Sequence, residues 1–118
     1  MKYMTLLYGA EDNGPEYGSP EWDPYMARWE AYHEKLVAAG IEFSGEPLQP
    51  STTATKLKVR GGKTETMDGP FAETKEQLGG FYILECKDLD EALKYAAMCP
   101  AAEDGTVEVR PVMDLGTG

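Results

Sequence analysis

The chain has 118 residues, the length of one domain, which we take to span residues 1–118. Its 21 acidic and 11 basic side chains give a net charge of −10, which argues against binding to nucleic acid or to an anionic membrane surface. No stretch approaches the roughly 20 apolar residues of a membrane helix, and the first residues do not read as a signal peptide. The two cysteines form no close-spaced metal or redox motif, so we expect a reduced, cytoplasmic protein.

The first third of the chain predicts a strand, a loop and a helix. Residues 2–9 read as the strand, and residues 10–24, which are rich in Gly, Pro and acids, read as the loop. Asp23 is predicted to be the N-cap of the helix with Pro24 in its first position, and Gly40 is predicted to end it. The apolar stripe of this helix is predicted to consist of Met26, Trp29, His33, Leu36 and Val37.

The rest of the chain predicts a hairpin, two further strands and a second helix. Gly61-Gly62 separates two short strand-like runs and predicts a tight hairpin, since both turn residues need positive φ. Asp88 and Glu91 predict a capping box, and Pro100 is predicted to stop the helix that begins there. The expected elements are an irregular connection over 45–51, strands 55–60, 63–67, 81–86 and 106–113, and helix 89–98 with Leu89, Ala92, Leu93 and Ala96 on its inner face.

This order of elements predicts an α+β fold of the ferredoxin-like kind, a βαβ(β)βαβ sandwich in which two helices cover one face of an antiparallel sheet. Strand 81–86 is apolar on both faces, with Phe81 and Ile83 on one and Tyr82 and Leu84 on the other. Since two helices cover only one face, we expect a homodimer with the sheets packed face to face. The alternative is that Tyr82 is a half-exposed aromatic residue.

His33 and Asp68 are the candidate catalytic residues. His33 is the only histidine and lies on the predicted inner stripe, where an imidazole can act as a general acid or base. The alternative is a core histidine hydrogen-bonded to the backbone. Asp68 opens an Asp-Gly-Pro-Phe turn, which either presents the carboxylate to a cleft or holds it in a structural Asx turn. The two residues make at most a dyad, because no nucleophile for a hydrolytic triad is evident.

The candidate substrate-binding residues are basic or aromatic. Arg60 and Arg110 could each hold a ligand's carboxylate with two hydrogen bonds, and the alternative for Arg110 is pairing with a carboxylate of the protein itself. One histidine and no cysteine pair give no support for a metal site, and the glycine-rich stretches match no phosphate loop, so we expect no cofactor. An apolar pocket for a small molecule is expected to be lined by Tyr8, Trp29, Tyr32, Phe71 and Tyr82.

The stretch MDGPFAETKEQLGGFYILE, residues 67–85, resembles the signature of the DGPF group within the YCII-related family. The resemblance extends over essentially the whole chain, through KYMTLLYG at residues 2–9, GEPLQPSTTATKLKV at 45–59 and VEVRPVM at 107–113. It implies a ferredoxin-like, dimeric α/β-barrel fold.

The resemblance also implies a site. Proteins of the broader family are suspected enzymes because a histidine and an aspartate lie in their cleft. Asp68 matches the motif of that aspartate. The family's histidine lies near the start of the first helix, roughly where Arg28 or Trp29 stands, and His33 follows one turn later on a similar face.

Two functional hypotheses follow from the sequence. The first is a cofactor-independent enzyme in which Asp68 and His33 transfer protons on a small polar or carboxylate-bearing metabolite. The second is a non-catalytic ligand-binding or accessory module. Proteins of the DGPF type are often encoded beside extracytoplasmic-function sigma factors, so the resemblance implies a regulatory link for the second hypothesis.

Overall fold

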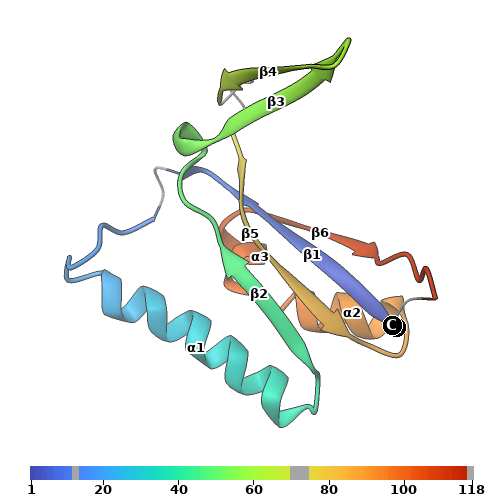
Figure 1. The fold of residues 1–118 in the computed structure, drawn as a ribbon. Coiled ribbons are helices and arrows are strands. Elements are labelled where there is room, and N and C mark those ends of the chain that lie inside the picture. The colour runs from blue at the N-terminus through green and yellow to red at the C-terminus, as the bar shows by residue number, and fades with distance from the viewer. Residues whose placement is uncertain (12–13, 70–74, 117–118) are drawn as a thin grey trace.

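The computed structural model describes residues 1–11, 14–69 and 75–116 of the chain. Its main sheet has four antiparallel strands, which Figure 1 shows side by side. Each half of the chain supplies one central and one edge strand, which confirms the predicted α+β, ferredoxin-like architecture. The strand order is β2 (Phe43–Pro47), β5 (Gln77–Glu85), β1 (Lys2–Gly9) and β6 (Thr106–Pro111).

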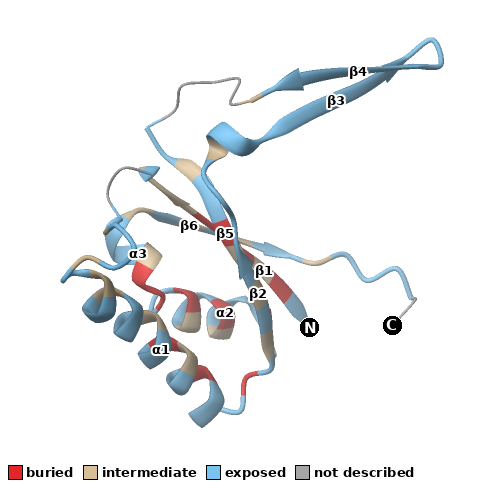
Figure 2. Cartoon of the chain, turned by 60° about the vertical axis from the view of Figure 1, so that its left-hand side comes forward, coloured by how far each residue is buried: buried red, intermediate tan, exposed pale blue. Residues whose placement is uncertain are grey.

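The described part of the chain has three α-helices, and Figure 2 shows them on the same side of the sheet. None of these helices is long and apolar enough to span a membrane. The third and shortest helix was not among the predicted elements, because Pro100 was expected only to stop a helix. The helices are α1 (Trp22–Ala38), α2 (Leu89–Ala96) and α3 (Pro100–Asp104).

The helix ends differ from the predicted ones for local reasons. The N-cap of α1 is Glu21 and not Asp23, because a turn at Ser19 already directs the backbone into the helix, with the Trp22 N–H donating to the Ser19 carbonyl at 3.1 Å. Asp23 lies in the first helical turn, where its charge suits the helix dipole. Pro100 begins α3, since the first position of a helix tolerates a missing N–H.

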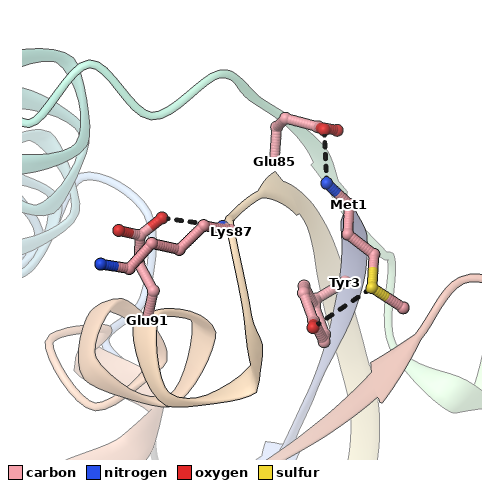
Figure 3. Close-up of polar contacts among 5 residues, drawn as sticks. All are labelled: Met1, Tyr3, Glu85, Lys87 and Glu91. Carbon is pink, nitrogen blue, oxygen red and sulfur yellow. Dashed lines mark hydrogen bonds and ion pairs between the residues drawn. The ribbon is translucent and has the colours of Figure 1, made fainter.

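The start of α2 shows one of the two hydrogen bonds of the predicted capping box. Asp88 is the N-cap, and its carboxylate accepts a hydrogen bond from the Glu91 N–H at 2.9 Å. The Glu91 carboxylate accepts from the N–H of Lys87, at 3.0 Å, and not from that of the N-cap as the pattern predicts (Figure 3). The same view shows the amino group of Met1 donating to the Glu85 carboxylate at 2.7 Å. These bonds fix both ends of the turn between β5 and α2.

Strand β2 lies partly in the stretch that was interpreted as irregular, and that interpretation is wrong for residues 45–47. Gly and Pro form strands poorly, so the local sequence carries little strand signal. The strand exists because it pairs with β5 at the edge of the sheet, where Pro47 is tolerated at its end. A Cβ on Gly45 would collide with the Phe81 carbonyl and crowd the Tyr82 ring, so this glycine lets two strands and a ring meet closely.

The core lies between the sheet and the helices. Tyr32 and Leu36 on α1 are buried with Leu84 on β5. Met26 and Val37 of the predicted stripe are exposed, and the prediction is wrong for both. The side of α1 that faces the sheet is instead the one that carries Trp29, Tyr32 and Leu36, because the large rings fill the space over the sheet.

Helix α2 contributes small side chains to the core. Ala92 and Ala96 are buried, whereas Leu89 and Leu93, which were predicted to lie on the inner face, are exposed. The two alanines let the short helix approach the sheet closely. The close approach leaves the larger leucines on the solvent side.

The second face of the sheet carries apolar side chains that none of the described helices covers. The register places Met4 beside Ile83 and Leu6 beside Phe81, and all four are partly exposed. We call these four residues the open face. Tyr82 lies on the helix-covered face and is 9% exposed, so the half-exposed alternative for Tyr82 is wrong. The sheet therefore has one apolar face covered by helices and one available for contact.

A hairpin of two strands forms a separate sheet that stands away from the main one (Figure 1). Its turn residues have positive φ, 57° at Gly61 and 76° at Gly62, which confirms the predicted tight hairpin. We call residues 55–68 the arm, and every residue of its strands is exposed. The strands are β3 (Thr55–Arg60) and β4 (Lys63–Asp68), and a short 3-10 helix, η2 (Ser51–Thr53), precedes them.

We expect Leu36→Ala to lower the free energy of unfolding by about 2–5 kcal/mol, because it leaves a void where the side chain is 0% exposed. The matched control is Val37→Ala, since Val37 is 68% exposed and its truncation should change stability by about 0.5 kcal/mol or less. Urea unfolding followed by circular dichroism measures both. Equal losses in the two variants would contradict the observed stripe.

Candidate functional site

A cavity of about 640 Å³ lies where β1 leads into the loop before α1. Its walls come from the first half of α1, the segment after β2, the start of β5 and α3. This volume falls within the range of about 300–1,000 Å³ typical of small-molecule sites. The lining includes Tyr8, Tyr25, Arg28, Trp29, Gln49 and Asp104.

A β-bulge shapes the sheet at the edge of the cavity. Leu7 on β1 lies opposite Gly80 on β5, but Tyr8 lies opposite Leu78, so Gly79 is an extra residue on β5. Leu7, Tyr8 and Gly79 all line the cavity. The bulge therefore bends the two central strands at the point where the cavity begins.

Helix α1 supplies an aromatic wall. The rings of Tyr25 and Trp29, one helical turn apart, have centroids 6.4 Å apart at 68°. Trp29 also stacks on Tyr82, with centroids 6.4 Å apart and planes at 16°. Because Tyr82 is buried, its ring holds Trp29 in place from the core side. The faces of such rings suit apolar groups and cations.

The charged groups at the cavity are mostly carboxylates. Arg28 donates from Nη1 to Asp104 Oδ2 at 2.9 Å and from Nη2 to Glu103 Oε2 at 3.3 Å. The hydrogen bond to Asp104, followed by the charges of both carboxylates, raises the pKa of Arg28. Glu11, which also lines the cavity, accepts a hydrogen bond from the Ser51 N–H at 2.8 Å. The lining therefore holds two carboxylates, Glu11 and Asp104, and one guanidinium, and Glu103 adds a third carboxylate beside Arg28.

Close packing at Gly105 positions Asp104 beside the cavity. A Cβ on Gly105 would collide with the backbone carbonyl of Tyr8, so glycine permits this approach of α3 to β1. The Gly105 N–H donates to the Ala101 carbonyl at 2.8 Å and closes the last turn of α3. Asp104 therefore reaches Arg28 from an element distant in the sequence.

His33 lies behind the wall and does not line the cavity. Its Nε2 is 2.6 Å from the Tyr82 hydroxyl, and its ring centroid is 5.3 Å from that of Phe43. The side chain is thus a hydrogen-bonded histidine at the edge of the core, with a tyrosine as its partner instead of the backbone. Burial raises the pKa of Tyr82 to about 12, so the phenol is neutral near pH 7.

Asp68 and Arg60 both lie on the arm and are exposed. Arg60 donates from Nη1 to the Val59 carbonyl at 3.0 Å, and neither residue lines the cavity. Figure 1 shows α1 and β4 at opposite ends of the molecule. The structure therefore does not bring Asp68 and His33 together within one chain.

Two of the five aromatic residues expected to line a pocket reach the cavity, namely Tyr8 and Trp29. Tyr32 and Tyr82 are buried in the core. Phe71 lies outside the described residues.

Arg110 lies on β6, away from the cavity. Its Nε is 3.6 Å from Glu108 Oε2, which matches the alternative of pairing within the protein, although the arginine side chain is 71% exposed. Within the described ranges, no group of three His, Cys, Asp or Glu side chains is placed to hold a metal ion.

Tyr25, Arg28 and Asp104 are among the residues of the cavity that the sequence reasoning did not place in a pocket. Tyr25 and Trp29 are four residues apart, so they lie on the same face of the helix, and this aromatic pair could have predicted the wall from the sequence. Arg28 directly precedes Trp29. Asp104 carries no such signal, because tertiary packing of α3 brings it to the cavity.

A model of the YCII-related domain matches residues 1–116. The chain belongs to the YCII-related family. A relative from Rhizobium meliloti (strain 1021), the uncharacterized protein R00369, is 41% identical over 114 residues, which cover 95% of this chain and 92% of the relative. The family resemblance stated from the sequence is therefore confirmed.

From the sequence, the family's histidine position is expected near Arg28 and Trp29. Both residues line the cavity, whereas His33 does not. The cavity therefore coincides with the region of the first helix that the family resemblance singles out.

We expect Tyr82→Phe to lower the free energy of unfolding by roughly 1 kcal/mol at pH 7, because it removes the hydrogen bond to His33. The folded-state pKa of Tyr82, about 12, lies above its ordinary value of 10.0. The stability that the neutral Tyr82 phenol contributes to the folded state is therefore fully present below pH 10 and is lost as the pH rises toward 12. Urea unfolding across this range should show a steeper loss of stability in the wild type than in the variant.

Tyr32→Phe is the matched control for this comparison. The Tyr32 hydroxyl is buried and has no hydrogen-bond partner among the described residues. Its removal should leave the stability at pH 7 unchanged or higher. A loss as large as that of Tyr82→Phe would contradict the assigned role of the Tyr82–His33 hydrogen bond.

Proposed function

We propose that this YCII-related protein is a ligand-binding module whose site is the cavity beside the first half of α1. The observation that carries the proposal is the aromatic wall of Tyr25 and Trp29, which borders a volume of about 640 Å³ and is braced from behind by Tyr82. Rings that are already ordered can bind the apolar part of a ligand with little loss of conformational entropy.

The charges at the cavity favour a ligand that is cationic or rich in hydrogen-bond donors. Arg28 is already paired with Asp104 and Glu103, so a ligand's carboxylate would have to compete with both for the guanidinium. An ammonium group would share Asp104 with Arg28, and it would also gain from Glu11, whose hydrogen bond comes from the uncharged Ser51 N–H, and from the ring face of Trp29. We therefore favour a small amine with an apolar part over the carboxylate-bearing metabolite considered from the sequence.

Proton transfer by Asp68 and His33 has less support as the function. His33 is hydrogen-bonded to Tyr82 behind the wall, and Asp68 lies on the arm. An accessory or regulatory role needs ligand binding alone, so the sigma-factor link implied by the resemblance to the DGPF group is compatible with the proposed module.

We also propose that the protein is a cytoplasmic homodimer in which the two open faces meet. The buried free thiols of Cys86 and Cys99 suit a reducing compartment. An apolar centre with a polar rim is the usual composition of a protein interface. Around the open face, the neighbouring strands place Ser44, Glu46, Glu108 and Arg110.

We expect a thermal-shift screen with matched pairs of aromatic amines and aromatic carboxylic acids to stabilise the protein with the amines. A ligand at ten times its Kd adds about 1.4 kcal/mol, which raises Tm by several degrees for a domain of this size. Trp29→Ala should abolish the shift, and the matched control Met26→Ala, on the same helix but outside the cavity lining, should keep it. Stabilisation by the acids alone would contradict the charge argument.

We expect Asp68→Asn and His33→Gln to leave the affinity for such an amine unchanged, because neither residue lines the cavity. Asp104→Asn should weaken amine binding by about tenfold, since it removes one carboxylate from the lining. Isothermal titration calorimetry measures all three. If Asp68→Asn and His33→Gln abolish binding or any detected turnover while Trp29→Ala does not, the proton-transfer hypothesis is the better one.

A further inference from the structure

The arm has two chemically different faces. Paired residues of antiparallel strands lie on the same face, so Leu57 with Thr66 and Val59 with Thr64 form one side. This side carries Thr55, Leu57, Val59, Thr64, Thr66 and, at the root of the hairpin opposite Thr55, Asp68. We call it the apolar face of the arm, because Leu57 and Val59 lie at its centre. The opposite, basic face carries Lys56, Lys58, Arg60, Lys63, Glu65 and Met67.

An isolated two-stranded hairpin is only marginally stable in water. The arm is such a hairpin, since among the described strands β3 and β4 pair only with each other, and Leu57, on the apolar face, is 63% exposed. Apolar and β-branched side chains on one side of a hairpin are typical of a strand pair that packs against another surface. Within the described residues, the apolar face of the arm is therefore left exposed.

The whole chain exposes more surface than a compact monomer. Its accessible surface is 8610 Å², whereas a compact monomer of 13.0 kDa exposes about 6,300 Å². The radius of gyration is 16.6 Å, compared with about 13.5 Å for a compact domain of 118 residues. The excess, roughly 2,300 Å², exceeds the 800 Å² or so that a standard interface buries on each partner.

The charge of the arm is opposite to that of the rest of the chain. Residues 55–68 contain four of the 11 basic and two of the 21 acidic side chains, a net charge of +2, which leaves −12 on the remaining residues. A second copy of this chain therefore attracts the arm electrostatically as a whole, while Leu57 and Val59 make the contact and the basic side chains lie on the face turned away from it. The arm is also within reach of such a copy, because Figure 2 shows it leaving the sheet on the side away from the helices, where the open face lies.

We propose that the apolar face of the arm packs against a second copy of this chain, so that two protomers hold each other with exchanged arms. Strands of six residues give the arm a length of about 20 Å. The thinnest dimension of the molecule is also 20 Å, so the arm can extend across a partner. This contact goes beyond the ligand-binding function and is separate from the meeting of the two open faces.

The test uses two variants that place the same new charge on opposite faces of the arm. Leu57→Glu alters the apolar face, and the matched control Met67→Glu alters the basic face, where the original side chains are 63% and 59% exposed. Sedimentation equilibrium of the full chain measures the dissociation constant of the dimer, and hydrogen exchange measures the protection of amides in residues 55–68. We expect Leu57→Glu to weaken the dimer about tenfold or more and to abolish the protection of the arm, while Met67→Glu, which makes the same change in charge, weakens the dimer much less and keeps the protection.

Three other results would overturn the arm contact, and they can be told apart. A wild-type dimer whose arm amides are unprotected, or equal effects of the two variants, would leave only the open-face contact. A wild type that remains a 13.0 kDa monomer at all concentrations would overturn the arm contact and the homodimer together. Binding of amines to the cavity is measured separately, so none of these results decides the proposed ligand-binding function.

Discussion

The ring of Tyr82 is the contact on which both the core and the cavity wall depend. It packs edge-on against Tyr32 at 5.6 Å and stacks on Trp29 at 6.4 Å, so one side chain of β5 holds two turns of α1. Its hydroxyl is 2.6 Å from Nε2 of His33, which adds a polar contact at the edge of the core. The missing Cβ of Gly45 on the neighbouring strand leaves the ring the space it needs.

This arrangement explains why the aromatic wall is rigid and why the single histidine is not available to the cavity. Trp29 presents one face to the cavity, while its other face is held by Tyr82. His33 is one helical turn further along, beside Phe43, where its Nε2 already has a partner. An imidazole in that position stabilises the fold, and the chemistry at the cavity is left to Tyr25, Arg28 and their neighbours.

The cavity and the arm share a short connecting segment. Glu11, in the cavity lining, accepts a hydrogen bond from the first residue of η2, Ser51. The Gly69 N–H, just beyond the arm, donates to the Ala54 carbonyl at 2.7 Å and closes the root of the hairpin. The segment that borders the cavity is therefore also the segment from which the arm extends.

Local sequence patterns predicted the elements whose geometry is fixed by neighbouring residues. The Gly61-Gly62 turn requires positive φ at both positions, and the capping box at Asp88 satisfies the N–H groups that begin a helix, so both were predictable. Whether the predicted dyad of Asp68 and His33 forms could not be decided in this way, because the distance between the two residues depends on where the arm stands relative to α1.

The sequence by itself determined the family, the α+β class, the acidic charge, the hairpin and the presence of Trp29 on the inner side of the first helix. These follow from composition, from turn and cap chemistry, and from periodicity over a few residues. Only the tertiary structure decided that β2 is a strand, that Tyr82 lies under the helices, and that Asp104 meets Arg28 at a cavity. Each of those depends on contacts between residues more than 30 positions apart, where the chain closes on itself and no local pattern specifies the partner.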